Sequence, residues 1–185
     1  MNIELAVPYV AQRGEGANGS ANDCGAAATK SLVLVNRTTA PQVDLLAREA
    51  AGIEGQAYPN YNGLQMTTLI ELGRRYGVTL QRKKPATWDN ALWEVTEHVG
   101  SKRPIIALVH YDALPLANRL EKRNGKVKGH YIVLVGVKAG KVIYHDPYHD
   151  GTGGKALRLT FEQLRAAWEA NPLDDNPKYD MLILT

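Results

Sequence analysis

The chain has 185 residues, of which 44% are hydrophobic and 22% are charged, and its formal net charge is +3 at pH 7. These values are ordinary for a soluble globular protein with a sizeable core, and they exclude a chain too polar to fold. No apolar stretch approaches the roughly 20 residues of a membrane span, and a single cysteine excludes an internal disulfide framework. We expect one domain over residues 1–185.

Residues 1–10 lack the basic start and apolar core of a signal peptide. We therefore expect a cytoplasmic protein as the chain stands, or a secreted one if the chain is part of a longer precursor or is exported by another route. The basic residues are scattered except for one cluster, Lys122–Lys128, which we interpret as a solvated loop. We expect no nucleic-acid partner, and the sequence does not indicate an oligomeric state.

The first half of the chain has the spacing of helices. An extended arm over residues 3–10 leads into a loop over 13–22 that is rich in Gly, Asn and Ser. Helices are predicted over 24–36, from Pro41, over 64–76 with Gly77 as its C-cap, and over 88–99 with Trp93 on its buried stripe. A loop over 52–63 separates the second of these helices from the third.

The second half has the pattern of strands. β-Branched and apolar runs predict strands over 104–111, 129–137, 141–145 and 179–184, with short strand 78–81 before them. Thr160 is predicted to cap a last helix over 161–170. Helices followed by antiparallel strands indicate an α+β fold.

Cys24 lies where the first loop meets the first predicted helix. Asn22 or Asp23 can serve as the N-cap, which places Cys24 at or within the first helical turn. The unpaired N–H groups of that turn carry partial positive charge and stabilise a thiolate, which is the nucleophilic form of cysteine. A lone cysteine is more often a small buried hydrophobe, so the catalytic interpretation depends on what lies downstream.

Downstream, His130 begins a predicted strand and Asp146 ends the next one. Catalysis by sulfur needs an imidazole that accepts the thiol proton and a third group that orients the imidazole. It also needs a donor for the oxyanion, for which Gln12 and the backbone N–H of Cys24 are the candidates. Cys24, His130, Asp146 and Gln12 are therefore the predicted catalytic residues.

The hairpin register decides whether His130 and Asp146 can meet. A two-residue turn at Ala139-Gly140 would set Asp146 opposite Val133, on the other face of the sheet from His130. A three-residue turn or a bulge would correct this, and Gly136 is a plausible bulge site.

Four motifs occur in an order that is known from one family. They are Val7-Pro8-Tyr9-Val10-Ala11-Gln12, Asp23-Cys24-Gly25-Ala26-Ala27, Gly129–Gly136 with the sequence GHYIVLVG, and His145-Asp146-Pro147. In this the chain resembles the papain-like cysteine peptidases of the bacteriocin-processing, double-glycine peptidase type and their stand-alone bacterial relatives. The resemblance spans nearly the whole chain.

The resemblance implies a papain-like fold in which the helix of the nucleophile packs on a C-terminal antiparallel sheet. It implies a thiol nucleophile at Cys24, a general base at His130, an orienting acid at Asp146 and an oxyanion donor at Gln12. The implied reaction is hydrolysis of a peptide or related amide bond, without a metal or other cofactor and with a peptide or protein as substrate. The loop between Gln12 and Cys24 is longer than is usual in the family.

Other functions fit the same residues. A cell-wall peptide amidase or endopeptidase uses the same Cys–His pair on related folds, and a non-catalytic module could bind a peptide in the cleft. Transfer of the acyl group to an amine, rather than to water, is a further alternative. The pocket is expected to form from loops 13–22, 52–63 and 112–128.

Three residues near Asp146 raise the question of a metal. His145, His149 and Asp150 could be ligands, but His-Asp-Pro-Tyr-His-Asp lacks the regular spacing of zinc sites. We therefore predict no metal site, and we assign Gly153-Gly154 only a turn.

Overall fold

A computed structural model describes residues 1–13, 22–120, 129–170 and 178–185. Most of the predicted loop 13–22 and the cluster Lys122–Lys128 lie outside these residues. The helices are α1 (Cys24–Asn36), α2 (Val43–Ile53), α3 (Met66–Arg75), α4 (Trp88–Gly100) and α5 (Phe161–Glu169). The strands are β1 (Asn2–Glu4), β2 (Leu80–Lys83), β3 (Ile105–His110), β4 (Gly129–Lys138), β5 (Lys141–His145), β6 (Leu157–Thr160) and β7 (Met181–Leu184).

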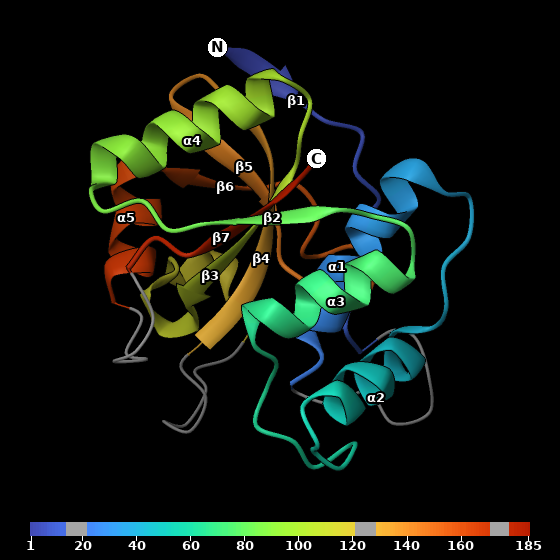
Figure 1. Cartoon of the computed structure of the whole chain (residues 1–185). Coiled ribbons are helices and arrows are strands. Elements are labelled where there is room, and N and C mark those ends of the chain that lie inside the picture. Colours follow the sequence, from blue (N-terminus) through green and yellow to red (C-terminus); the bar gives the residue numbers. More distant parts are fainter. Residues whose placement is uncertain (14–21, 121–128, 171–177) are drawn as a thin grey trace.

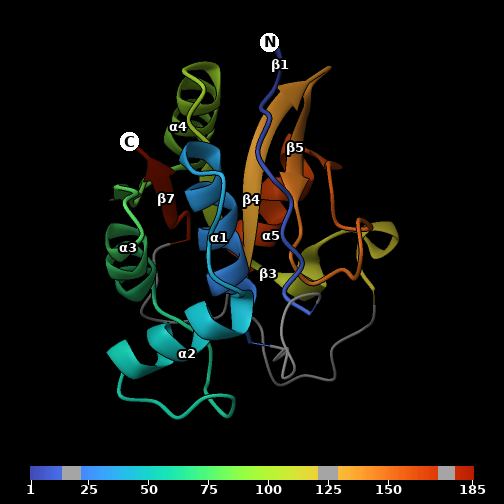
Figure 2. The same cartoon turned by 90° about the vertical axis from the view of Figure 1, so that its right-hand side faces the viewer.

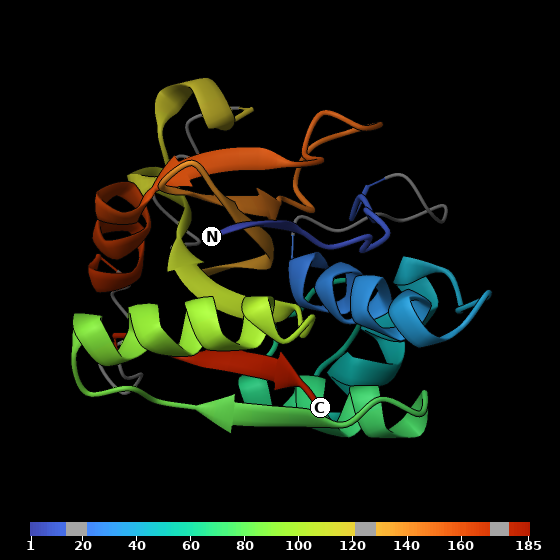
Figure 3. The same cartoon turned by 90° about the horizontal axis from the view of Figure 1, so that it is seen from above.

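The strands of the described residues form one antiparallel sheet of seven. Its order is β2-β7-β3-β4-β5-β6, and β1 pairs with β4. Seen from above, β2 lies at one edge (Figure 3). Helices and an antiparallel sheet in this arrangement are the predicted α+β, papain-like fold.

Helices cover both faces of the sheet (Figure 1). One face packs against α1, α2 and α3, and the other packs against α4 and α5. Residues on both faces of β3 and β4 are therefore buried, which explains why their sequences are continuous apolar runs and not alternations. The helix α4 belongs to the N-terminal part of the chain, but it covers the face opposite α1.

Several predicted boundaries were wrong by a few residues. The second helix begins at Val43 and not at Pro41, and the first predicted strand is β2 at Leu80–Lys83 and not at 78–81. The edge strand β6 was not predicted. Trp93 is 60% exposed and not buried, because the buried stripe of α4 consists of Ala91, Val95, His98 and Val99.

The β4–β5 hairpin contains a bulge, which was one of the two predicted solutions to the register problem. Its turn is the two residues Ala139-Gly140, and the pairing shifts by one residue between Leu134 and Gly136. Below the shift Val133 pairs with His145, so the next step sets Asp146 opposite Ile132. Because Ile132 is two residues from His130, the bulge brings Asp146 to the face of His130.

The N-terminal arm runs along β4 and then reaches the end of β5. After β1, the Leu5 N–H donates to the Val135 carbonyl at 2.7 Å, and the Gln12 N–H donates to the Pro147 carbonyl at 2.7 Å. The arm thereby connects the bulge of β4 to the turn that follows Asp146. Across the described ranges, none of the helices has the length and apolar character to cross a membrane.

Candidate active site

Cys24 is the first residue of α1 and is buried. Asp23 occupies the N-cap position, as predicted, but its side chain makes no capping bond. The Asp23 carboxylate instead accepts the hydroxyl of Tyr61 at 2.6 Å and that of Tyr58 at 3.4 Å. These hydrogen bonds hold the loop 52–63 beside the start of α1. This is one of the loops that we predicted to form the pocket.

Close packing of α1 on β4 brings the cysteine and the histidine together. The helix runs alongside the strand (Figure 2). A Cβ atom at Gly25 would lie 3.1 Å from a methyl carbon of Leu69 and 3.2 Å from the ring of Tyr131, which is closer than side chains usually pack. The thiol of Cys24 is among the hydrogen-bonding groups that raise the pKa of His130, so the two predicted catalytic side chains lie within reach of each other.

His130 and Asp146 form a buried pair. The His130 Nε2 lies 2.6 Å from Asp146 Oδ1, and both side chains are 0% exposed. Burial by itself lowers the pKa of His130, but the charge and hydrogen bond of Asp146, together with Cys24, outweigh it and raise the pKa to about 9. Since Nε2 binds Asp146, Nδ1 is the ring nitrogen that is left for the thiol of Cys24.

Asp146 is held on its main chain as well as on its side chain. Its N–H donates to the Gly154 carbonyl at 2.8 Å, and Oδ1 also accepts the Tyr148 N–H at 2.9 Å. Burial raises the pKa of Asp146, but the charge and hydrogen bond of His130 and the Tyr148 N–H reverse this and leave the pKa below its usual value. The pair therefore favours a carboxylate beside an imidazolium.

Aromatic rings that were not predicted surround His130. The Tyr111 and Tyr148 rings meet the imidazole edge to face, with centroids 5.0 Å and 6.2 Å away. Arg13 covers Tyr148 from outside, with its guanidinium carbon 4.4 Å from the ring centroid. The position of Tyr148, two residues after Asp146, was the only sign of this shell in the sequence.

Gln12 is fully buried, and its bond to Pro147 places its backbone beside the Asp146 turn. Its use as an oxyanion donor stays a prediction.

His145 has a structural role, because both of its ring nitrogens bind backbone groups. Its Nε2 donates to the Val7 carbonyl at 3.0 Å and its Nδ1 accepts the Ala156 N–H at 3.0 Å. Burial lowers the pKa of His145, and an Nδ1 that accepts a hydrogen bond belongs to the neutral form of the ring. Within the described ranges, no three His, Cys, Asp or Glu side chains are grouped as metal ligands.

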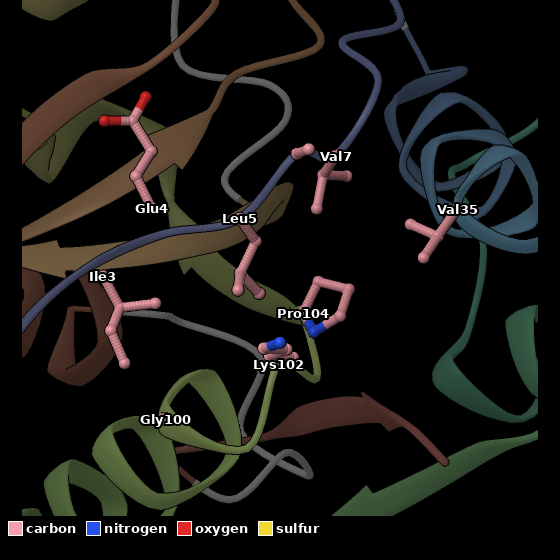
Figure 4. Close-up of a pocket in the computed structure, with 9 residues that line it drawn as sticks. Ile3, Glu4, Leu5, Val7, Val35, Gly100, Lys102 and Pro104 are labelled. Atoms are coloured by element: carbon pink, nitrogen blue, oxygen red, sulfur yellow. The ribbon is translucent and has the colours of Figure 1, made fainter.

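An apolar cavity of about 340 Å³ opens elsewhere, between the N-terminal arm and the ends of α1 and α4 (Figure 4). Its lining includes Leu5, Val35 and Pro104. Val35 lies eleven residues after Cys24 on α1, which is about 16 Å along a helix. The cavity is therefore at the opposite end of α1 from Cys24.

The model of the Peptidase_C39 like family matches residues 4–172. The chain belongs to this family. The match includes Cys24, His130 and Asp146, and the family and the fold are those of cysteine peptidases. No curated protein sequence matches the chain.

Solved structures of C39 peptidases have the same fold. A candidate C39-like peptidase from Bacillus anthracis has a TM-score of 0.68 at 16% identity and covers 100% of this chain and 98% of its own. The peptidase domain of Streptococcus ComA, a bifunctional ABC transporter involved in quorum sensing, has a TM-score of 0.56 at 16% identity, with 93% and 98% covered. A double glycine motif protease from an AMS/PCAT transporter, in complex with a leader peptide, has a TM-score of 0.56 at 13% identity, with 100% and 98% covered.

Proposed function

We propose that this C39-family chain is a peptidase in which Cys24 is the nucleophile, His130 the general acid and base, and Asp146 the group that orients His130. The observation that carries the proposal is the buried His130–Asp146 pair at 2.6 Å, with Cys24 among the groups that raise the pKa of His130. An imidazolium that is stable to about pH 9 favours the thiolate form of its partner at neutral pH.

Hydrolysis would proceed in two halves. The thiol proton passes to His130 Nδ1, and the sulfur attacks the carbonyl carbon of the substrate. The C–N bond then breaks as His130 returns the proton to the departing amine, which leaves an acyl-thioester on Cys24. A water molecule gives a proton to His130 and attacks the thioester, and the released sulfur recovers that proton.

The oxyanion of each tetrahedral intermediate needs donors near the sulfur. The N–H of Cys24, at the start of α1, is one, and the positive end of the helix dipole adds to it. The side-chain amide of Gln12 is the second in this proposal. Its support is the fixed backbone of Gln12, which is bound to Pro147 next to Asp146.

The proposed substrate is a peptide or protein segment that lies in an extended form across the start of α1. The loop 52–63, which Asp23 binds through Tyr61, would form one wall. Because a related double glycine motif protease has been solved with a leader peptide, peptides that contain a Gly-Gly pair are the first probes to test.

The deciding experiment combines hydrolysis of a peptide library with labelling by a thiol-directed peptide probe, both read by mass spectrometry. We expect Cys24→Ala to abolish cleavage and labelling while thermal unfolding is unchanged. His130→Ala should lose more turnover than Asp146→Asn, since an asparagine oxygen can still orient the imidazole. Unchanged cleavage by Cys24→Ala would show that Cys24 is not the nucleophile.

The same experiment separates the alternatives. Release of peptides from peptidoglycan alone would identify a cell-wall enzyme. Binding of peptides without turnover would identify a binding module, and products joined to an added amine would identify acyl transfer.

A further inference from the structure

The two carboxylate oxygens of Asp146 have different surroundings. Oδ1 accepts two hydrogen bonds, from His130 Nε2 at 2.6 Å and from the Tyr148 N–H at 2.9 Å. Oδ2 is buried and has no hydrogen-bond partner within the described part of the chain. A buried carboxylate oxygen without a donor destabilises the ionised form, so this oxygen requires a compensating positive group.

His149 supplies such a group. Its Nε2 lies 3.7 Å from Asp146 Oδ2, and its side chain is only 11% exposed. The same nitrogen lies 2.9 Å from the carbonyl oxygen of Asn118. A carbonyl only accepts hydrogen bonds, so Nε2 carries a hydrogen. The N–H group that donates to Asn118 therefore lies beside the unsatisfied oxygen, although 3.7 Å is too long for a hydrogen bond to it.

The backbone of His149 is fixed as well. Tyr9, from the N-terminal arm, donates its hydroxyl to the His149 carbonyl at 2.7 Å and to the Asp146 carbonyl at 3.1 Å. The Tyr9 side chain thus fixes the backbones of Asp146 and His149 relative to each other. The titratable groups that face His149 are Asp146 and Tyr9, and Asp150 follows it in the chain.

We propose that His149 is a positioning residue of the active site, which holds Oδ2 of Asp146 so that Oδ1 stays directed at His130. The proposal rests on the proposed function. Without the Nε2–H of His149, the carboxylate would turn toward another donor or take up a proton. Either change weakens the His130–Asp146 pair, and the thiolate of Cys24 would then form at higher pH.

The test measures the rate at which iodoacetamide alkylates Cys24 as a function of pH, a readout that needs no substrate. His149→Gln can place an amide N–H where Nε2 lies, whereas the shorter side chain of His149→Asn cannot. We expect His149→Asn to lower the alkylation rate at pH 7 roughly tenfold, a usual size for one pairwise coupling, and to move the profile to higher pH. We expect His149→Gln to remain close to the wild type.

A second set of variants separates positioning from a structural role. In proteins that also carry Asp146→Asn, adding His149→Asn should not change the pH profile of Cys24 alkylation further. The carboxylate on which His149 acts is then already absent. His145→Asn, which removes a neighbouring buried histidine that does not contact the carboxylate, should leave the pH profile in place. An unchanged profile in His149→Asn, or an equal loss with and without Asp146, would overturn the proposal.

The outcome is separable from that of the proposed function. Absence of peptide cleavage, with the alkylation profile still dependent on His149, would refute the peptidase and leave the positioning role in place. Thermal unfolding of each variant identifies any loss that comes from misfolding.

Discussion

The backbone position of Asp146 depends on a neighbouring glycine, Gly154. The carbonyl oxygen of Asp146 lies 2.0 Å from the position that a Cβ atom would take at Gly154, and the hydroxyl of Tyr9 lies 2.7 Å from it. Any side chain at this position would push the backbone of Asp146 aside. The Gly153-Gly154 pair, for which we predicted only a turn, therefore contains one residue that shapes the site.

The two glycines provide a matched test. Gly154→Ala must displace the Asp146 turn, and a misplacement of about 1 Å is enough to lower catalysis about a hundredfold. At Gly153 a Cβ would meet its nearest neighbour at 3.5 Å, which is an ordinary contact, so Gly153→Ala should keep its activity. Peptide cleavage and Cys24 labelling measure both variants, and equal behaviour of the two would contradict this account.

Among the elements, the β4–β5 hairpin decides the geometry of the site. Its bulge is accompanied by a close approach of β1, since a Cβ at Gly136 would lie 2.6 Å from the Ile3 carbonyl oxygen and 3.1 Å from a methyl carbon of Ile143. Glycine at this position therefore lets the N-terminal strand pair with β4 at the place where the register shifts.

We expect Gly136→Ala to destabilise the fold by about 1–3 kcal/mol, as an added carbon does in a packed interior. The matched control is Gly52, which lies on the exposed side of α2 with nothing within 4 Å of its added carbon. Gly52→Ala should stabilise the protein by about 0.5–1 kcal/mol, because a helical glycine loses more backbone entropy on folding than alanine does. Urea unfolding measures both, and a tolerated Gly136→Ala would contradict the close approach.

The elements also show how far sequence reasoning reaches. Local signals were sufficient for α1, for the strand β4, and for α5, where Thr160 and Gln163 form a capping box. The alternation of side chains along the hairpin was sufficient to require a longer turn or a bulge, and the structure has the bulge, next to Gly136. These features are fixed by residues close together in the chain.

Features that arise from tertiary contacts were missed. The Asp23 side chain accepts a hydrogen bond from Tyr61 and does not cap α1. On α4, His98 is buried and Trp93 is exposed. The rings around His130, and the role that we propose for His149, depend on which loops meet in space. No local pattern in a single sequence contains that information.

For the whole molecule, the buried His130–Asp146 pair makes stability depend on pH in a defined direction. The folded state raises the pKa of His130 from 6.5 to about 9, so this stabilisation is complete below pH 6.5 and is lost as the pH rises through about 9. The pKa of Asp146 is lowered from 3.8, so its contribution is present above that pH and is lost in stronger acid. The pair therefore stabilises the fold most between about pH 4 and 6.5.

Urea unfolding at several pH values should show this as a difference between the wild type and Asp146→Asn. The difference is expected to be largest at about pH 5–6 and to shrink toward pH 9. His145 has the opposite slope, because its lowered pKa favours the folded state at higher pH, but it is common to both proteins and cancels. A difference that grows between pH 7 and 9 would show that the imidazolium is not the stabilised form.

Residues 1–12 run along the sheet and hold the Asp146 turn through the Tyr9 hydroxyl and the backbone N–H of Gln12. We expect a chain shortened to begin after Tyr9 to lose this hold on the Asp146 turn, and with it the activity proposed for Cys24, although no residue of the proposed triad is removed.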